Sequence, residues 1–155
     1  MSHPPSSNYL PHEYSHQQPF LHQSHSSSIR DILLYGSESR PPMLLSGTFT
    51  VWQQRFLQWL TYRPHADLML KSIRDGPYNM KFLADSTGLI RLQTDEDLHP
   101  NELIQYNADQ HSAWSITLGL PNSIYIKVDC LASAQEMWNC LEDMHSTEEL
   151  HHIIM

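Results

Sequence analysis

Apolar residues recur at helical spacing in several segments of the chain, and the pattern is clearest between residues 134 and 144. At 100° per residue, Ala134, Trp138 and Leu141 fall on one side of a helix, and the acidic and amide side chains of the segment fall on the other. Ser133 and Glu136 have the spacing of a capping box, which satisfies free amide groups of a first helical turn. The pattern predicts an amphipathic helix that begins after Ser133 and packs on a core.

A second helix is predicted over residues 51–62. Its apolar face carries Trp52, Phe56, Trp59 and Leu60. Aromatic side chains bury about 150 to 250 Å² each in protein cores, so this short helix is expected to contribute strongly to the core. Residues 50 and 53, a Thr and a Gln, are placed to cap it. The alternative, a platform on which nucleic-acid bases stack, is disfavoured because only two arginines lie nearby.

The segment from Pro64 to Gly76 predicts another short helix, and residues 101–118 predict a long one. In the long helix, Trp114 and Leu118 share a sector with Leu103, Tyr106 and Ala113, but Asn107, Gln110 and His111 fall there too. That sector is expected to face the core. After the break at Leu120 and Pro121, one or two further turns are predicted around Ile124, Tyr125 and Val128, and Ser146 or Thr147 can begin a last helix.

The segments 80–83 and 89–92 can pair as a short hairpin around Asp85-Ser86-Thr87-Gly88, although their alternation is weak. The expected fold class is all-α, a small bundle of about five short helices, and the sequence leaves open whether a minor β-hairpin is added to it. Residues 1–40 are rich in Ser, His and Pro, and we expect a disordered tail there, followed by a helical domain over residues 41–155. Within the tail, residues 29–35 can form either a helix or a strand.

Charge is distributed unevenly along the chain, whose net charge is −8. From Asp95 to Glu149 there are eleven acidic residues and one basic residue, whereas the first 94 residues carry six acidic and eight basic residues. The second half is thus a poor candidate for phosphate binding. No 18-residue apolar run and no secretory signal occurs, and the two cysteines are expected to pack reduced as small hydrophobes, which favours an intracellular, cytoplasmic protein.

Two short motifs resemble catalytic ones. Residues 12–16 match the H-E-x-x-H zinc-peptidase pattern, but flanking prolines and the lack of an apolar stripe argue against the helix that this chemistry needs. Asp85 and Gly88 are one residue too far apart for the Asp-Thr-Gly loop of aspartic proteases, and a simple turn accounts for them. We therefore expect no catalytic, cofactor-binding or metal-binding residues, no cofactor and no enzymatic activity.

The run LGLPNSIYIKVDCLASAQEMWNCLEDM closely resembles the Gag region of plant copia-type LTR retrotransposon polyproteins. The similarity extends to LLSGTFTVWQQRFLQWL and MLKSIRDGPY, and covers residues 43–150. It implies a capsid-like, all-helical domain. The residues expected to form the structural core of this motif are Trp52, Phe56, Trp59, Leu60, Trp114, Leu118, Leu120, Pro121, Ile124, Tyr125, Val128, Ala134, Trp138 and Leu141, with Ser133 and Glu136 as the helix cap.

The resemblance implies a non-enzymatic protein that contacts other copies of itself or other Gag chains, as in capsid-type self-assembly. The Cys-x2-Cys-x4-His-x4-Cys zinc knuckle is absent, so the chain is expected to be truncated before it, and nucleic acid is not an expected partner. No membrane partner is expected. An inert remnant of a transposable element, a host adaptor that binds a partner protein, and weak nucleic-acid binding through the N-terminal half remain as alternatives.

Overall fold

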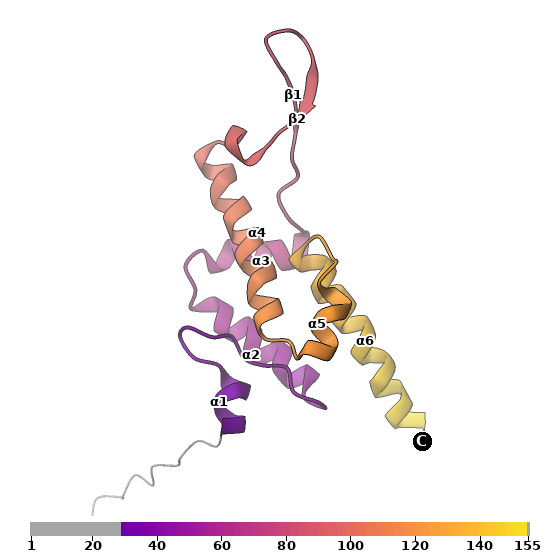
Figure 1. The fold of residues 1–155 in the computed structure, drawn as a ribbon. Helices are drawn as coiled ribbons and strands as arrows, with labels where there is room; N and C mark the ends of the chain where they lie inside the picture. The colour runs from indigo at the N-terminus through magenta and orange to yellow at the C-terminus, as the bar shows by residue number, and fades with distance from the viewer. Residues whose placement is uncertain (1–28, 155) are drawn as a thin grey trace, which may run out of the picture.

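The computed structural model describes the backbone of residues 29–154 and the side chains of residues 29–146. The described residues are mostly helical, which confirms the predicted fold class (Figure 1). The elements are α1 (Ile29–Tyr35), α2 (Phe49–Thr61), α3 (Ala66–Asp75), β1 (Phe82–Ala84), β2 (Ile90–Leu92), the 3-10 helix η1 (Asp95–Asp97), α4 (Pro100–Leu118), α5 (Asn122–Val128) and α6 (Ala134–Ile154).

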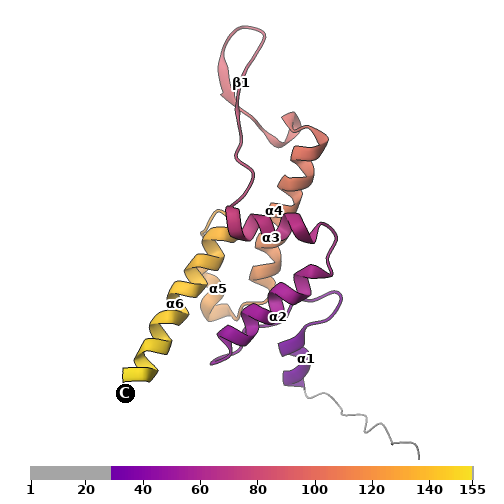
Figure 2. The same cartoon turned by 180° about the vertical axis from the view of Figure 1, so that it is seen from behind.

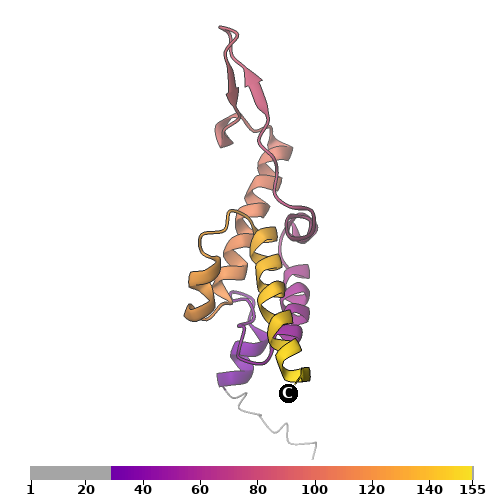
Figure 3. The same ribbon diagram turned by 90° about the vertical axis from the view of Figure 1, so that its right-hand side faces the viewer.

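The helices form one body, and the hairpin β1–β2 projects from one end of it (Figures 1 and 2). Helix α1 lies at the opposite end. Helix α4 packs against α3 and α6, and α3 also packs against α2 and α6. Helix α6 runs along one side of the body (Figure 1), and it faces the viewer in the side view of Figure 3. It packs there against α3 and α4.

The core is built around three aromatic rings from α2 and α6. The ring of Trp52 lies 5.2 Å from that of Phe56 and 5.6 Å from that of Trp138, and Phe56 and Trp138 are 5.7 Å apart, measured between centroids. Tilted pairs at such distances are favourable because the ring quadrupoles avoid face-to-face overlap. Leu60 and Leu141 are fully buried beside them. The predicted inward faces of these two helices are confirmed.

The folded body begins before residue 41, so the predicted boundary of the tail is wrong. Residues 29–35 form α1, and the loop after it packs on α2, because the indole N–H of Trp59 donates a hydrogen bond to the carbonyl of Ser37 at 2.7 Å. Farther on, Leu44 donates its amide to the carbonyl of Gly119 at 2.7 Å. The expectation of disorder for residues 1–28 lies outside the described part of the chain.

Helix α4 faces the core with the side opposite to the predicted one. Its buried residues are Ala108, Asp109, Ser112, Ser115 and Ile116. Trp114 is 59% exposed and Leu118 is 38% exposed, so their expected place in the core is wrong. The physical reason is the close crossing with α3: the hydroxyl of Ser112 donates a hydrogen bond to the carbonyl of Met69 at 3.1 Å, and only small side chains fit there.

The remaining predicted core residues divide into three groups. Leu120, Val128 and Ala134 are buried, as predicted. Trp59, Pro121 and Ile124 are half-buried. Tyr125, expected in the core, lies at the surface because α5 has only 7 residues and turns a single narrow side, centred on Val128, to the bundle.

Helix ends agree only in part with the sequence. The hydroxyl of Ser133 accepts the amide of Glu136 at 3.2 Å, as predicted, but the carboxylate of Glu136 accepts the amide of Ala132 at 2.9 Å instead of that of Ser133. Helix α2 begins at Phe49, two residues earlier than predicted, with Thr48 instead of Thr50 as its N-cap residue and without a side-chain cap. The prediction of a separate last helix that begins at residue 146 or 147 is wrong, because α6 continues through these residues without a break.

Candidate protein interaction surface

The side of α4 that the sequence assigned to the core forms an apolar strip on the surface. We call it the Trp114 face; it consists of Leu103, Ile104, Asn107, His111, Trp114 and Leu118. These positions recur at intervals of three and four residues, so they line up along one side of the helix. The ring of His111 stacks beside that of Trp114, with centroids 6.2 Å apart. An exposed tryptophan in an apolar strip is typical of protein interfaces.

Two shallow hollows border the Trp114 face, and His111, Met69 and Pro64 line both. One, of about 180 Å³, lies towards Ile104 and Asn107. The other, of about 230 Å³, lies towards Trp114 and Trp59. The face is therefore an uneven surface with room for side chains of a partner, a shape that interface anchor residues use.

The hairpin adds a second exposed apolar surface. In its register Phe82 pairs with Leu92 and Ala84 pairs with Ile90, so these four side chains lie on one face of the two-stranded sheet. Phe82 is 76% exposed and Ile90 is 73% exposed. The predicted hairpin is confirmed, but its exposure was not foreseen, since alternation alone does not show whether another element covers a strand.

A polar cluster holds the base of the hairpin against α4. The single O–H of Tyr78 is shared between Glu102 and the side-chain oxygen of Gln93, which lies 2.9 Å away and also accepts the amide of Lys81 at 3.1 Å. The bond to Glu102 raises the pKa of Tyr78, and the same bond lowers the pKa of Glu102. Every group in the cluster has a partner that accounts for it, so these shifts indicate a structural junction.

The turn of the hairpin is also accounted for structurally. One carboxylate oxygen of Asp85 accepts the amide of Thr87 at 2.8 Å, the hydroxyl of Thr87 at 2.6 Å and the amide of Leu89 at 3.0 Å. This is a side-chain-stabilised turn. The H-E-x-x-H match at residues 12–16 lies outside the described residues. Among the described side chains, those of residues 29–146, no group of three or more His, Cys, Asp or Glu is placed to hold a metal ion.

Both cysteines are free thiols, but only one packs as predicted. Cys140 packs against the core on α6, whereas Cys130 is exposed because it follows the end of α5. Within the described part of the chain, no helix has the length and apolar content that crossing a bilayer requires. Comparison of the chain with protein-family models, curated proteins and solved structures finds no match.

Proposed function

We propose that this chain is a non-enzymatic, Gag-like protein that associates with further copies of itself, and that the Trp114 face is a contact surface. The observation that carries the proposal is the exposure of Trp114, 59%, within a strip that also includes Leu103, Ile104 and Leu118. Covering such a strip with a partner would contribute about 25 cal/mol of favourable free energy for each Å² of apolar area removed from water. The sequence resemblance to retrotransposon Gag supports another copy as that partner.

Self-association suits a helical body with several exposed apolar surfaces. Shells are built from many copies through repeated interfaces, each of which need not be strong alone. The Trp114 face and the apolar hairpin face lie on different elements, so one copy can contact more than one neighbour. A single-partner adaptor needs only one such surface, which is why self-assembly is the preferred proposal.

Sedimentation velocity of the full chain over a range of concentrations tests the proposal. We expect the wild-type protein to form concentration-dependent oligomers and Trp114→Ser to shift the oligomers towards monomers. Val51→Ser is the matched control, because Val51 is an exposed apolar residue of α2 outside the Trp114 face. A wild-type protein that stays monomeric at every accessible concentration would refute self-association. A monomer that forms a stoichiometric complex with one other protein would support the adaptor alternative instead.

A further inference from the structure

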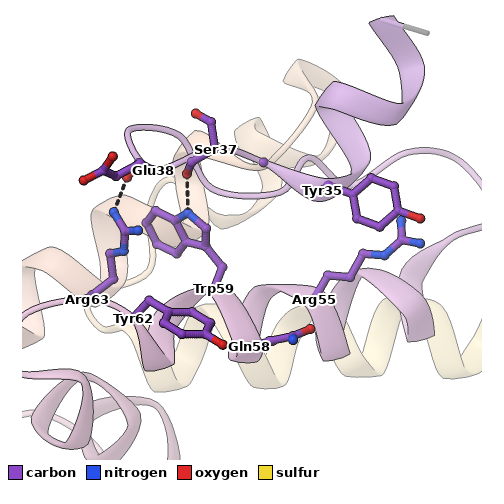
Figure 4. A pocket seen from close by; sticks show the side chains of 9 residues that line it. Tyr35, Ser37, Glu38, Arg55, Gln58, Trp59, Tyr62 and Arg63 are labelled. Carbon is purple, nitrogen blue, oxygen red and sulfur yellow. Dashed lines mark hydrogen bonds between the residues drawn. The ribbon is translucent and has the colours of Figure 1, made fainter. Parts of the chain in front are cut away.

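A groove lies between α2 and the loop that follows α1 (Figure 4). It has a volume of about 280 Å³, and its walls include Tyr35, Arg55, Gln58, Trp59, Tyr62 and Arg63. Two cation–π contacts shape it: the guanidinium carbon of Arg55 lies 4.0 Å from the ring centroid of Tyr35, and that of Arg63 lies 4.4 Å from the ring centroid of Trp59. The groove thus combines an aromatic floor with two positive charges.

Neither guanidinium group has a carboxylate partner among the described residues. Arg63 donates a hydrogen bond to the backbone carbonyl of Glu38, and its Nε is buried without a partner. Figure 4 shows the carboxylate of Glu38 directed away from the space between Trp59 and Arg55. A guanidinium that stacks on a ring still presents N–H groups at its edge, where they can bind a carboxylate. The groove is therefore complementary to a segment that carries both acidic and apolar side chains.

Such a segment lies at the other end of the same molecule. Residues 90–96 place the exposed apolar side chains of Ile90 and Leu92 a few positions before the exposed acidic side chains of Asp95 and Glu96. Neither acid forms an ion pair within the described residues, whereas Asp97 is paired with Arg91. In Figure 1, β2 and η1 lie at the hairpin end of the body, and α1, whose Tyr35 lines the groove, lies at the opposite end. The two surfaces are too far apart on one copy to meet.

We propose that the groove binds the exposed side chains of Ile90, Leu92, Asp95 and Glu96 of a second copy, in a head-to-tail contact between the aromatic, basic groove and the apolar, acidic side chains of this segment. The inference rests on the proposed self-association and names a second interface for it. A contact between two different surfaces leaves one of each free on the resulting dimer, so it extends into chains unless the rotation closes a ring. Because opposite charges contribute to it, the contact should weaken as salt rises and the screening length falls.

Charge reversal at each end gives a test on the full chain. We expect Arg55→Glu/Arg63→Glu and Asp95→Lys/Glu96→Lys each to weaken the salt-sensitive association by at least ~10-fold, since like charges then face each other. An equimolar mixture of the two variants should regain assembly, because the acidic segment of one meets the basic groove of the other and the reversed pair is again complementary. Sedimentation velocity at low and high salt measures both effects.

Lys71→Glu/Arg74→Glu is the matched control for Arg55→Glu/Arg63→Glu, because it makes the same change of net charge at exposed positions of α3 outside the groove. Circular dichroism checks that each variant is folded. If loss of the Arg63 hydrogen bond unfolds the double variant, Arg55→Glu alone takes its place in the test. Reversal variants that associate like the wild type, or a mixture that does not regain assembly, would overturn this inference and leave the Trp114 contact standing. A monomeric wild type would overturn the proposed function and this inference together.

Discussion

The indole N–H of Trp52 donates a hydrogen bond to the backbone carbonyl of Pro42 at 3.1 Å. Both residues are buried, and Trp52 is only 1% exposed. The bond joins the extended segment before α2 to the aromatic cluster, and a further bond of that segment, from the amide of Leu44 to the carbonyl of Gly119, joins it to the end of α4. The segment between α1 and α2 is thereby fixed to two helices.

Replacing Trp52 tests this junction. Trp52→Phe keeps an aromatic ring but leaves the carbonyl of Pro42 without its donor, and an unsatisfied buried group costs about 1 to 3 kcal/mol. We expect the free energy of unfolding, measured by urea denaturation, to fall by that amount or slightly more, since the smaller ring also leaves space. Trp114→Phe, on the exposed face of α4, should change it by less than about 0.5 kcal/mol. Equal losses in the two variants would contradict the structure.

Gly119 allows the same segment to approach α4. Its φ of −87° is accessible to any residue, so the backbone conformation does not require glycine here. The requirement for glycine comes from the lack of space for a side chain. A Cβ at this position would lie 2.5 Å from the carbonyl oxygen of Pro42. We expect Gly119→Ala to lower the free energy of unfolding by about 1 to 3 kcal/mol, the usual cost of overpacking. Gln110→Ala, at an exposed position of α4, is the control. A Gly119→Ala protein as stable as the wild type would show that the segment can move away at little cost.

The sequence predicted helices well where hydrophobicity and burial coincide. In α2 and α6 the large apolar residues are also the buried ones, so the faces of Trp52 and Trp138 could be assigned from spacing alone. In α4 the two properties separate. The buried side carries Ser112 and Ala108, which allow α3 to come close, and the largest apolar residue, Trp114, is exposed. Spacing identifies the faces of a helix but cannot tell which neighbour requires small side chains.

The candidate site shows the same limit. The Trp114 face was visible in the sequence as a mixed sector, and its polar members Asn107 and His111 were the signal that it lies at the surface. The groove was harder to foresee. Arg55 and Arg63 stand out beside Trp59 in the sequence, but Tyr35 comes from a segment assigned to the tail, and only the packed loop after α1 brings it to α2. Long-range pairings of this kind leave no local pattern.

The Arg91–Asp97 pair predicts a pH-dependent contribution to stability. Hydrogen bonds from Arg91, at 2.6 and 2.8 Å, and from the amide of Thr94 hold the pKa of Asp97 well below its usual range. A carboxyl group whose pKa is depressed on folding stabilises the protein above its unfolded-state pKa of about 3.9, and this stabilisation is lost as pH falls through the folded-state value. Asp97→Asn should therefore lower the melting temperature at pH 7.

That difference in melting temperature between wild type and Asp97→Asn should shrink below about pH 4, where the carboxyl group of the unfolded chain begins to be protonated while that of the folded protein is still ionised. Differential scanning calorimetry from pH 7 to about pH 2 measures it. Asp95→Asn is the control, because Asp95 forms no ion pair within the described residues, and its effect at pH 7 should be smaller. A difference that stays constant over the whole range would contradict a role for the ionised carboxylate.

Gln93 tests how the hairpin is held to the body. It is 5% exposed, it accepts hydrogen bonds from Tyr78 and from the amide of Lys81, and it donates one to Glu102 at 3.4 Å. Gln93→Leu removes all three and leaves the amide of Lys81 without its partner. We expect faster hydrogen exchange in residues 78–93, with little change in α2 or α6. Uniformly faster exchange would show instead that the hairpin and the helices unfold together.

Two buried serines, Ser72 of α3 and Ser112 of α4, predict opposite results for the same substitution. Both Ser72 and Ser112 are completely buried. The hydroxyl of Ser112 donates to the carbonyl of Met69, whereas that of Ser72 has no hydrogen-bond partner among the described residues. Removing a hydrogen-bonded hydroxyl lowers the free energy of unfolding by about 0.5 to 1.5 kcal/mol. Removing a buried hydroxyl that has no partner raises it, because the folded protein no longer bears the cost of taking that group out of water. Alanine also has the higher helix propensity.

We therefore expect Ser112→Ala to lower the free energy of unfolding by about 1 kcal/mol and Ser72→Ala to raise it by up to about 1 kcal/mol. Urea denaturation of the two variants beside the wild type measures both changes, and each serves as the control for the other because burial and chemistry are matched. If Ser72→Ala were destabilising to the same degree as Ser112→Ala, the hydroxyl of Ser72 would have to be hydrogen-bonded in solution, which would contradict the structure at this position.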